Sequence, residues 1–160
     1  LAEVWSKTPE LRNNPHSKLL LIGKNRGVDL SAAEGIDNVM LEDREVSDEE
    51  FYYLLTHTDV YVLPYKKISQ SGALMSAITT GTPMLVTETG GLTEPFKIAP
   101  IGWTMPANDA TALREKLLWL LEHPEEVQKV KGNSQAWQKV REYYSWEHIG
   151  QQTAALYHEI

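Results

Sequence analysis

The chain contains no cysteine among its 160 residues, which excludes disulfides and thiolate metal sites and is compatible with a reducing compartment. The patterns H-x-x-x-H and D-x-D are absent too, so we expect no metal site. No apolar run approaches the ~20 residues that a membrane-spanning helix needs. The first residues lack the charged start and the apolar centre of a signal peptide.

Basic residues are scarce as well, with 15 against 22 acidic residues and a net charge of −7. A nucleic-acid binder needs a basic face to displace counterions, so this charge balance argues against nucleic acid as a partner. The rest of the composition is ordinary for a globular protein, with 42% hydrophobic and 23% charged residues. The length suffices for a sizeable core, and we expect residues 1–160 to form a single domain.

Five short apolar runs are the candidate strands of this domain. The first, "KLLLIG", is almost wholly apolar, which is typical of a strand buried on both faces of a parallel sheet. The runs are Lys18–Gly23, Asn38–Glu42, Asp59–Tyr65, Pro83–Glu88 and Gly102–Pro106.

Helical patterns lie between and after these runs. Residues 1–14 have apolar residues on one face, a helix follows the capping box of Ser47 and Glu50, and residues 72–81 form a small apolar helix closed by Gly81. Three further helices are expected to start at Asp109, Pro124 and Ser145. The alternation predicts an α/β fold with βαβ units, a parallel sheet and right-handed crossovers.

Ligands of such sheets bind at the carboxyl ends of the strands, so the loops that follow strands are the candidate sites. The loop from Pro64 to Gly72 follows a strand and opens a helix, where free backbone amides and the helix dipole attract anions. Ser69 and Ser71 can add hydroxyl donors, and Gly72 admits a ligand close to the backbone. The alternative is that Ser71 only caps the helix, and spacing alone leaves both open.

The loop "TETGGLTE", from Thr87 to Glu94, also follows a strand. Gly90 and Gly91 suit a nest of backbone amides for oxygen atoms, although a tight turn with two surface acids explains the same residues. "GKNRG" is a weaker phosphate-loop candidate, and the histidines are better explained as structural groups. His57 and His123, for example, lie near expected helix ends, where a cation is stabilising.

The order of these segments resembles the carboxyl-terminal domain of group 1 retaining glycosyltransferases, which are built from two facing Rossmann-like domains (the GT-B architecture). The likeness covers about residues 18–160 and rests on five segments in the same order. They are "KLLLIGKN", "NVMLEDREVSDEEFYYLLTHTDVYVLPY", "SGALMSAITTGTPMLVTETGGLTE", "GWTMPANDATALREKLLWLLEHPE" and "YYSWEHIGQQTAALY". The resemblance implies a Rossmann-like parallel sheet flanked by helices, followed by C-terminal helices.

The resemblance also implies which residues hold a sugar nucleotide. The diphosphate and sugar would lie against the start of the helix at residue 72 and against the glycine pair, and the nucleoside would lie near the loops after the first two strands. The donor diphosphate and sugar residues are Ser69, Gln70, Ser71, Gly72, Ala73, Gly90, Gly91 and Glu94. The nucleoside residues are Gly23, Lys24, Arg44 and Ser76.

The chain departs from the family in one important respect. The family carries two glutamates separated by seven residues, of which the first contacts the sugar and the second binds the ribose. Alignment on "AITTGTP" places Ser76 at the second position and Ile68 or Ser69 at the first, so neither is acidic. A hydroxyl at Ser76 can still bond a ribose, but more weakly than a carboxylate.

As a whole, the resemblance implies the donor-binding part of a glycosyltransferase that moves a hexose from a nucleoside-diphosphate sugar to a glycan or lipid-linked acceptor with retention. No cofactor is implied beyond the substrate. The implied location is the cytoplasm, with association at the inner membrane face left open. The family's first strand and acceptor domain would lie upstream, so we expect residues 1–160 alone to be inactive. The alternatives are a sugar-nucleotide epimerase of related architecture and a non-catalytic nucleotide-binding module.

Overall fold

The computed structural model describes residues 1–158 and contains five parallel strands in two sheets. The strands are β1 (Leu19–Ile22), β2 (Val39–Glu42), β3 (Tyr61–Leu63), β4 (Met84–Thr87) and β5 (Gly102–Met105). One sheet pairs β1 with β2, and the other has the order β3-β4-β5, with Leu85 of β4 opposite Val62 and Trp103. All five expected strands are therefore confirmed, and so is their parallel orientation.

The strands differ in burial from the expectation. All four residues of β4 are buried, but in β1 only Leu19 is buried and Leu20 remains 38% exposed. The expectation that the first apolar run is buried on both faces was therefore wrong. The physical reason is that only one face of β1 is covered: Leu19 lies in the same apolar core as Leu85 and Leu21 packs against it, whereas Leu20 points to the opposite face and belongs to neither apolar core of the described residues.

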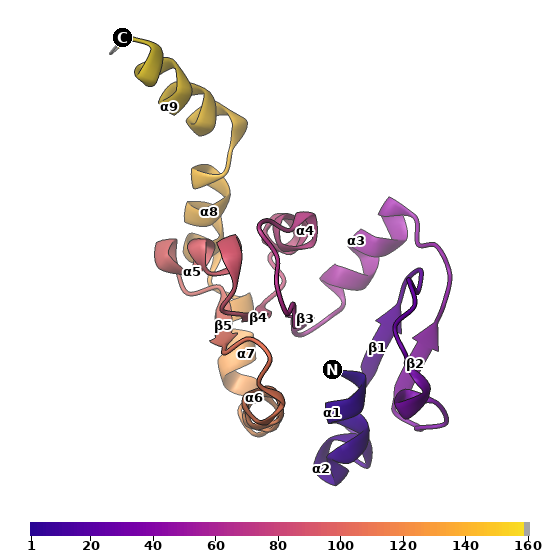
Figure 1. The fold of residues 1–160 in the computed structure, drawn as a ribbon. Coiled ribbons are helices and arrows are strands. Elements are labelled where there is room, and N and C mark those ends of the chain that lie inside the picture. Colours follow the sequence, from indigo (N-terminus) through magenta and orange to yellow (C-terminus); the bar gives the residue numbers. More distant parts are fainter. Residues whose placement is uncertain (159–160) are drawn as a thin grey trace.

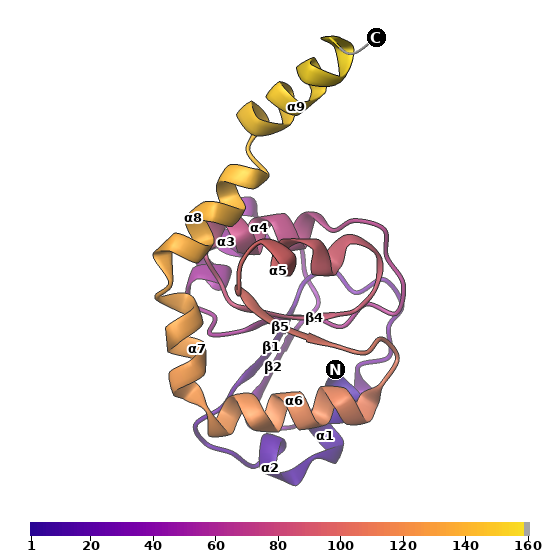
Figure 2. The same cartoon turned by 90° about the vertical axis from the view of Figure 1, so that its left-hand side faces the viewer.

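Helices lie on both faces of these strands, as expected for parallel sheets. In Figures 1 and 2, α4, α5 and α8 lie on one side of β4 and β5, whereas α1, α2 and α6 lie on the other. The helices of the described part are α1 (Ala2–Lys7), α2 (Pro9–Arg12), α3 (Asp48–Thr56), α4 (Gly72–Thr80), α5 (Glu94–Ile98), α6 (Ala110–Glu122), α7 (Pro124–Lys131), α8 (Ser134–Tyr143) and α9 (Trp146–His158). Short 3-10 turns occupy Ser31–Ala33 and Gly90–Thr93.

The helix starts follow the expected capping chemistry. The Ser47 hydroxyl accepts from the Glu50 amide at 3.2 Å, and the Asp109 carboxylate accepts from the Ala112 amide at 2.9 Å. Pro124 is the first residue of α7. Such caps satisfy amides that have no partner inside the helix.

One expected helix is in fact two. The segment that begins at Pro124 was expected to be continuous, but it breaks at Gly132 and Asn133 into α7 and α8. The Asn133 side chain accepts from the Ala136 amide at 3.1 Å and so starts a new helix. The break lets α8 turn back over the sheet, where Trp137 enters the core.

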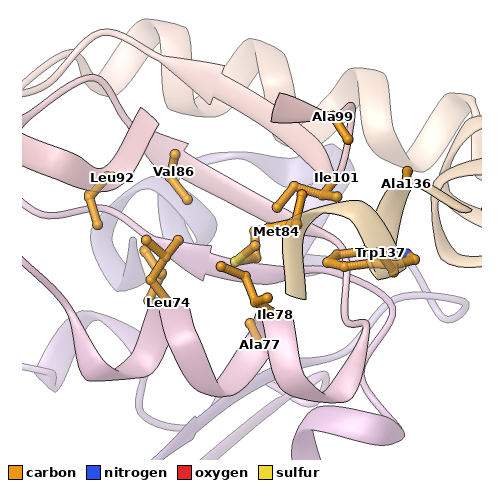
Figure 3. Close-up of a cluster of buried hydrophobic side chains, with 12 residues drawn as sticks. Leu74, Ala77, Ile78, Met84, Val86, Leu92, Ala99, Ile101, Ala136 and Trp137 are labelled. Atoms are coloured by element: carbon orange, nitrogen blue, oxygen red, sulfur yellow. The ribbon is translucent and has the colours of Figure 1, made fainter. Parts of the chain in front are cut away.

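Two apolar cores lie on the two sides of β4. Met84 and Val86 point into the core under α4 and α8, and Leu85 points into the core with α6. Figure 3 shows the first core, in which Trp137 of α8 lies beside Ile78, Met84 and Ile101. Alternate residues of one strand thus hold both layers of helices on the sheet.

The helix α9 projects away from the rest of the chain (Figures 1 and 2). None of residues 146–157 is buried, and Trp146 is 89% exposed. No helix in residues 1–158 is both long and apolar enough to span a bilayer.

Candidate functional site

The candidate site begins at the start of α4, directly after the loop that leaves β3. Ser71 is the N-cap residue, and its hydroxyl accepts from the Leu74 amide at 3.3 Å. Only 9% of Ser71 is exposed. The capping interpretation of Ser71 is therefore confirmed, and it leaves the question of which amides remain free.

The free amides are those of Gly72 and Ala73, because no protein group within residues 1–158 accepts a hydrogen bond from them. Gly72 is exposed, and a Cβ built on it would have no neighbour within 4 Å. The space over the first turn of α4 is therefore open. Unpaired amides and the positive end of the helix dipole favour an anion at such a place.

The loop after β4 packs tightly against the loop that precedes α4. The Gly91 amide donates to the Ser69 carbonyl at 3.0 Å. Gly90 has a φ of +53°, and a Cβ on it would overlap the Ile68 carbonyl oxygen. The two glycines thus allow one loop to approach the other, and this contact accounts for them without any ligand.

A buried hydroxyl holds the same two loops from below. Thr87, the last residue of β4, is 3% exposed and donates to the Tyr65 carbonyl at 2.7 Å. This hydrogen bond fixes the path of the chain between β3 and α4. Thr87 was not among the expected site residues, because a threonine at the end of a strand gives no signal of its distant partner.

The other expected residues of the loop before α4, of α4 and of α5 differ in what their side chains contact. Ser69 and Gln70 are exposed, and in the described part of the chain their side chains have no hydrogen-bond partner. The Ser76 hydroxyl donates to the Gly72 carbonyl at 3.2 Å, within α4. Glu94 begins α5, and its carboxylate accepts from the Lys97 ammonium at 2.8 Å.

Three of the four expected nucleoside residues lie after the carboxyl ends of β1 and β2, and the fourth, Ser76, lies in α4. Gly23 and Lys24 follow β1, and the Gly23 amide donates to the Glu42 carbonyl at 3.0 Å. Arg44 follows β2, and its Nε donates to the Glu42 carboxylate at 2.7 Å. Its Nη1 donates to the Glu50 carboxylate at 2.7 Å, and this bond holds the pKa of Glu50 below its usual value. Arg44 is therefore occupied by two carboxylates of its own chain.

Apart from Ser76 and Glu94, the expected residues thus fall into two groups. Ser69 to Ala73 lie together with Gly90 and Gly91, and Gly23 and Lys24 lie on the same sheet edge as Arg44. Within residues 1–158 no hydrogen bond joins the two groups. The arrangement follows the division of the strands into two sheets.

The histidines at helix ends have structural partners, as expected. His57 and His123 follow the last residues of α3 and α6, and their Nδ1 atoms lie 2.8 Å from the carbonyls of Tyr53 and Trp119. The His57 imidazole also stacks on the Tyr53 ring with a centroid distance of 4.0 Å, and the His123 imidazole stacks on the Trp119 ring with a centroid distance of 4.5 Å. In the described residues no group of three His, Asp or Glu side chains is placed to hold a metal ion.

The fold and these loops define an α/β domain of parallel strands with an anion-attracting helix start at the carboxyl end of β3. Residues 2–123 match the family model described as "Glycosyl transferases group 1", and the chain belongs to this family. The resemblance seen in the sequence motifs is therefore confirmed.

Relatives of known name are consistent with this assignment. The chain is 30% identical over 132 residues to the MMP alpha-(1->4)-mannosyltransferase of Mycolicibacterium hassiacum, covering 80% of this chain and 31% of that protein. Among solved structures, a sucrose-phosphate synthase from Thermosynechococcus elongatus has a TM-score of 0.71 at 21% identity, over 99% of this chain and 42% of that one. A glycosyltransferase from Rickettsia africae has a TM-score of 0.66 at 15% identity, over 99% of this chain and 43% of that one.

The structural matches confirm the expected fold class, in which parallel strands are flanked by helices. The chain spans less than half the length of each of these three proteins.

Proposed function

We propose that this chain is the donor-binding part of a glycosyltransferase that takes a nucleoside-diphosphate sugar and transfers a hexose with retention. The observation that carries the proposal is the open start of α4, where the Gly72 and Ala73 amides are free in a chain of this family. A diphosphate is the part of the donor that such a place attracts.

The start of α4 would hold the diphosphate both when the intact donor is bound and while the bond to the sugar breaks. Negative charge develops on the diphosphate as the bond to the sugar breaks, and amides fixed in advance stabilise that charge without rearrangement. Ser71 keeps the first turn of α4 in place, and Ser69 adds an exposed hydroxyl. Lys66 and Lys67 are exposed in the same loop and add positive charge.

The sugar and the nucleoside of the donor would lie on opposite sides of the diphosphate at the α4 start. Gln70, Gly90, Gly91 and Glu94 are proposed for the sugar side. Gly23, Lys24, Arg44 and Ser76 are proposed for the nucleoside side, where Arg44 would have to share its guanidinium with Glu42 and Glu50. Ser76 would exchange its hydrogen bond to Gly72 for one to a ribose hydroxyl.

The remaining partners follow from the same proposal. The acceptor would be a glycan or a lipid-linked sugar held by another part of the full-length protein. A lipid-linked acceptor would place the enzyme at the inner face of the membrane, and a glycan acceptor would leave it in the cytoplasm. No cofactor is needed besides the donor, because the leaving diphosphate is part of the substrate.

No observation favours an epimerase, which would need an acid and a base beside the sugar. The two histidines at helix ends have their Nδ1 atoms directed at backbone carbonyls, not at the α4 start.

Calorimetry on the full-length protein with a panel of nucleotide sugars tests the proposal. The panel should include GDP-mannose, because a relative is named as a mannosyltransferase, together with UDP-glucose and free UDP and GDP. We expect one nucleotide to bind and its sugar to be transferred, with the anomeric configuration read from the product by NMR. If no nucleotide sugar binds, the proposal fails, and binding without transfer to any acceptor points to a non-catalytic module.

A further inference from the structure

A hollow lies beside the loop after β4, on the side of that loop that faces β5. It has a volume of about 470 Å³ and is lined by Glu88, Thr89, Gly90, Thr93, Phe96, Lys97 and Thr104. Residues from the end of β4, from α5 and from β5 therefore meet in it. Apart from Gly90, none of these residues belongs to the expected donor site.

The polar groups of this hollow are arranged around one carboxylate. The Thr104 hydroxyl donates to Oε1 of Glu88 at 2.8 Å, and the Glu88 amide donates to the Met105 carbonyl at 2.8 Å. Glu88 is thereby held by its backbone and by one oxygen. Its other oxygen, Oε2, has no hydrogen-bond partner in the described part of the protein.

The hydroxyls of Thr89 and Thr93 also have no partner among the described residues. A hydroxyl both donates and accepts, and an ionised carboxylate only accepts. The hollow therefore offers acceptors and donors together, as a ligand rich in hydroxyl groups requires. Phe96 supplies the apolar part of the wall.

The charges in the hollow argue against an anionic ligand. Its one cation, Lys97, is paired with Glu94 at 2.8 Å, and Glu88 adds a negative charge. A phosphate would be repelled by the Glu88 carboxylate and would have to compete with Glu94 for Lys97. A neutral polyol meets no such penalty.

We propose that this hollow binds a neutral pyranose residue, with Glu88 Oε2 and the free threonine hydroxyls bonded to the sugar hydroxyls. This inference rests on the proposed function, because the hollow shares Gly90 with the loop that packs against the α4 start. It adds to that function a sugar subsite on the β5 side of the loop after β4. The subsite would hold a further sugar residue of a glycan acceptor, beyond the part of the acceptor that is held elsewhere in the full-length protein.

Saturation-transfer NMR on the full-length protein tests the subsite, with methyl α-mannopyranoside and methyl α-glucopyranoside as probes and free GDP or UDP present at saturation. We expect a millimolar affinity for at least one probe. Thr104→Val keeps the shape of the side chain but releases Glu88, and we expect it to weaken probe binding at least fivefold. Glu88→Ala should weaken binding by at least as much.

The matched controls are Thr111→Val and Glu115→Ala, which alter exposed residues of α6 and should leave probe affinity unchanged. Thermal unfolding of each variant establishes that it is folded. The inference would be overturned if Thr104→Val and Glu88→Ala bind the probes as well as the wild type does. It would also be overturned if neither probe binds to the wild type.

Calorimetry with nucleotide alone separates this inference from the proposed function. Loss of probe binding in Thr104→Val with unchanged nucleotide affinity supports the subsite. Probe binding that depends on Glu88 in a protein that binds no nucleotide would overturn the proposed function and leave the sugar subsite standing.

Discussion

At the residue scale, Gly72 and Gly90 both lie at the candidate site, but the two positions need a glycine for different reasons. Gly72 faces open space, so its lack of a side chain leaves room for a ligand. A Cβ on Gly90 would overlap the Ile68 carbonyl, so its lack of a side chain leaves room for the protein itself. Substitutions at the two positions should therefore act on different properties.

Gly72→Asp should weaken nucleotide binding without loss of folding. The new carboxylate has space but lies where the diphosphate is proposed, and the repulsion should lower affinity by about tenfold or more, which is ~1.4 kcal/mol. Calorimetry with the nucleotide that the wild type binds measures the effect. Gly72→Ala is the matched control, and it should retain most of the affinity; equal affinity of the Asp variant would remove this loop from the site.

Gly90→Ala should instead lower the free energy of unfolding. A Cβ at a φ of +53° is strained, and the overlap with Ile68 adds to that cost, so we expect a loss of about 2 kcal/mol or more. Gly35→Ala, at a φ of +70° in open space, carries only the strain and should lose about 1 kcal/mol. Urea unfolding measures both losses. Equal losses of unfolding free energy would show that the two loops can move apart to accommodate the new Cβ at little cost.

At the element scale, the sequence predicts the strands and helix caps well because both depend on neighbouring residues. Ser47, Ser71 and Asp109 cap helices through amides only three residues away. The break at Gly132 and Asn133 was missed although its signal, a glycine followed by a capping asparagine, is equally local.

The packing of the site was beyond prediction because its contacts join residues far apart in the chain. Gly91 bonds to Ser69, and Thr104 bonds to Glu88 on a neighbouring strand. Spacing along the sequence gives no measure of such distances. The sequence therefore offered an amide nest or a tight turn for the glycine pair, and it gave no sign of the contact with the neighbouring loop that accounts for both glycines.

Thr87→Val tests the hydrogen bond that ties β4 to the loop before α4. The valine keeps the volume but leaves the Tyr65 carbonyl without its donor, so we expect a loss of about 1–2 kcal/mol in unfolding free energy. Thr79→Val is the control, because Thr79 is exposed and bonds only within α4, and its effect should stay below about 0.5 kcal/mol. If both variants lose the same amount in urea unfolding, the Thr87 hydroxyl does not hold the loop.

At the scale of the whole molecule, two cores on opposite faces of β4 hold the helices to the sheet. Trp137 is 2% exposed and joins α8 to the core beside Met84 and Ile101 (Figure 3). Its Nε1 donates to the Val130 carbonyl at 2.9 Å, so the ring also fixes the turn between α7 and α8. Ala136 and Val140 of α8 are buried in the same core, so these side chains and Trp137 together anchor α8 to the sheet.

Trp137→Ala should cost about 3–5 kcal/mol of unfolding free energy, because it opens a cavity and leaves a carbonyl without its donor. Trp146→Ala is the matched control, since Trp146 is 89% exposed, and it should change the free energy by less than about 0.5 kcal/mol. Tryptophan fluorescence during denaturation follows both variants. A small loss for Trp137→Ala would mean that α8 is not anchored there.

The exposure of α9 has a consequence for local unfolding of the chain. A helix of 13 residues with no buried side chain among residues 146–157 has little besides its own hydrogen bonds to keep it formed. Its amide protons should therefore exchange with solvent through local fraying, orders of magnitude faster than those of α4, whose exchange requires the core to open. In hydrogen-exchange terms, we expect α9 and the sheet to behave as two cooperative units, with α9 unwinding and re-forming while every contact of the sheet stays in place.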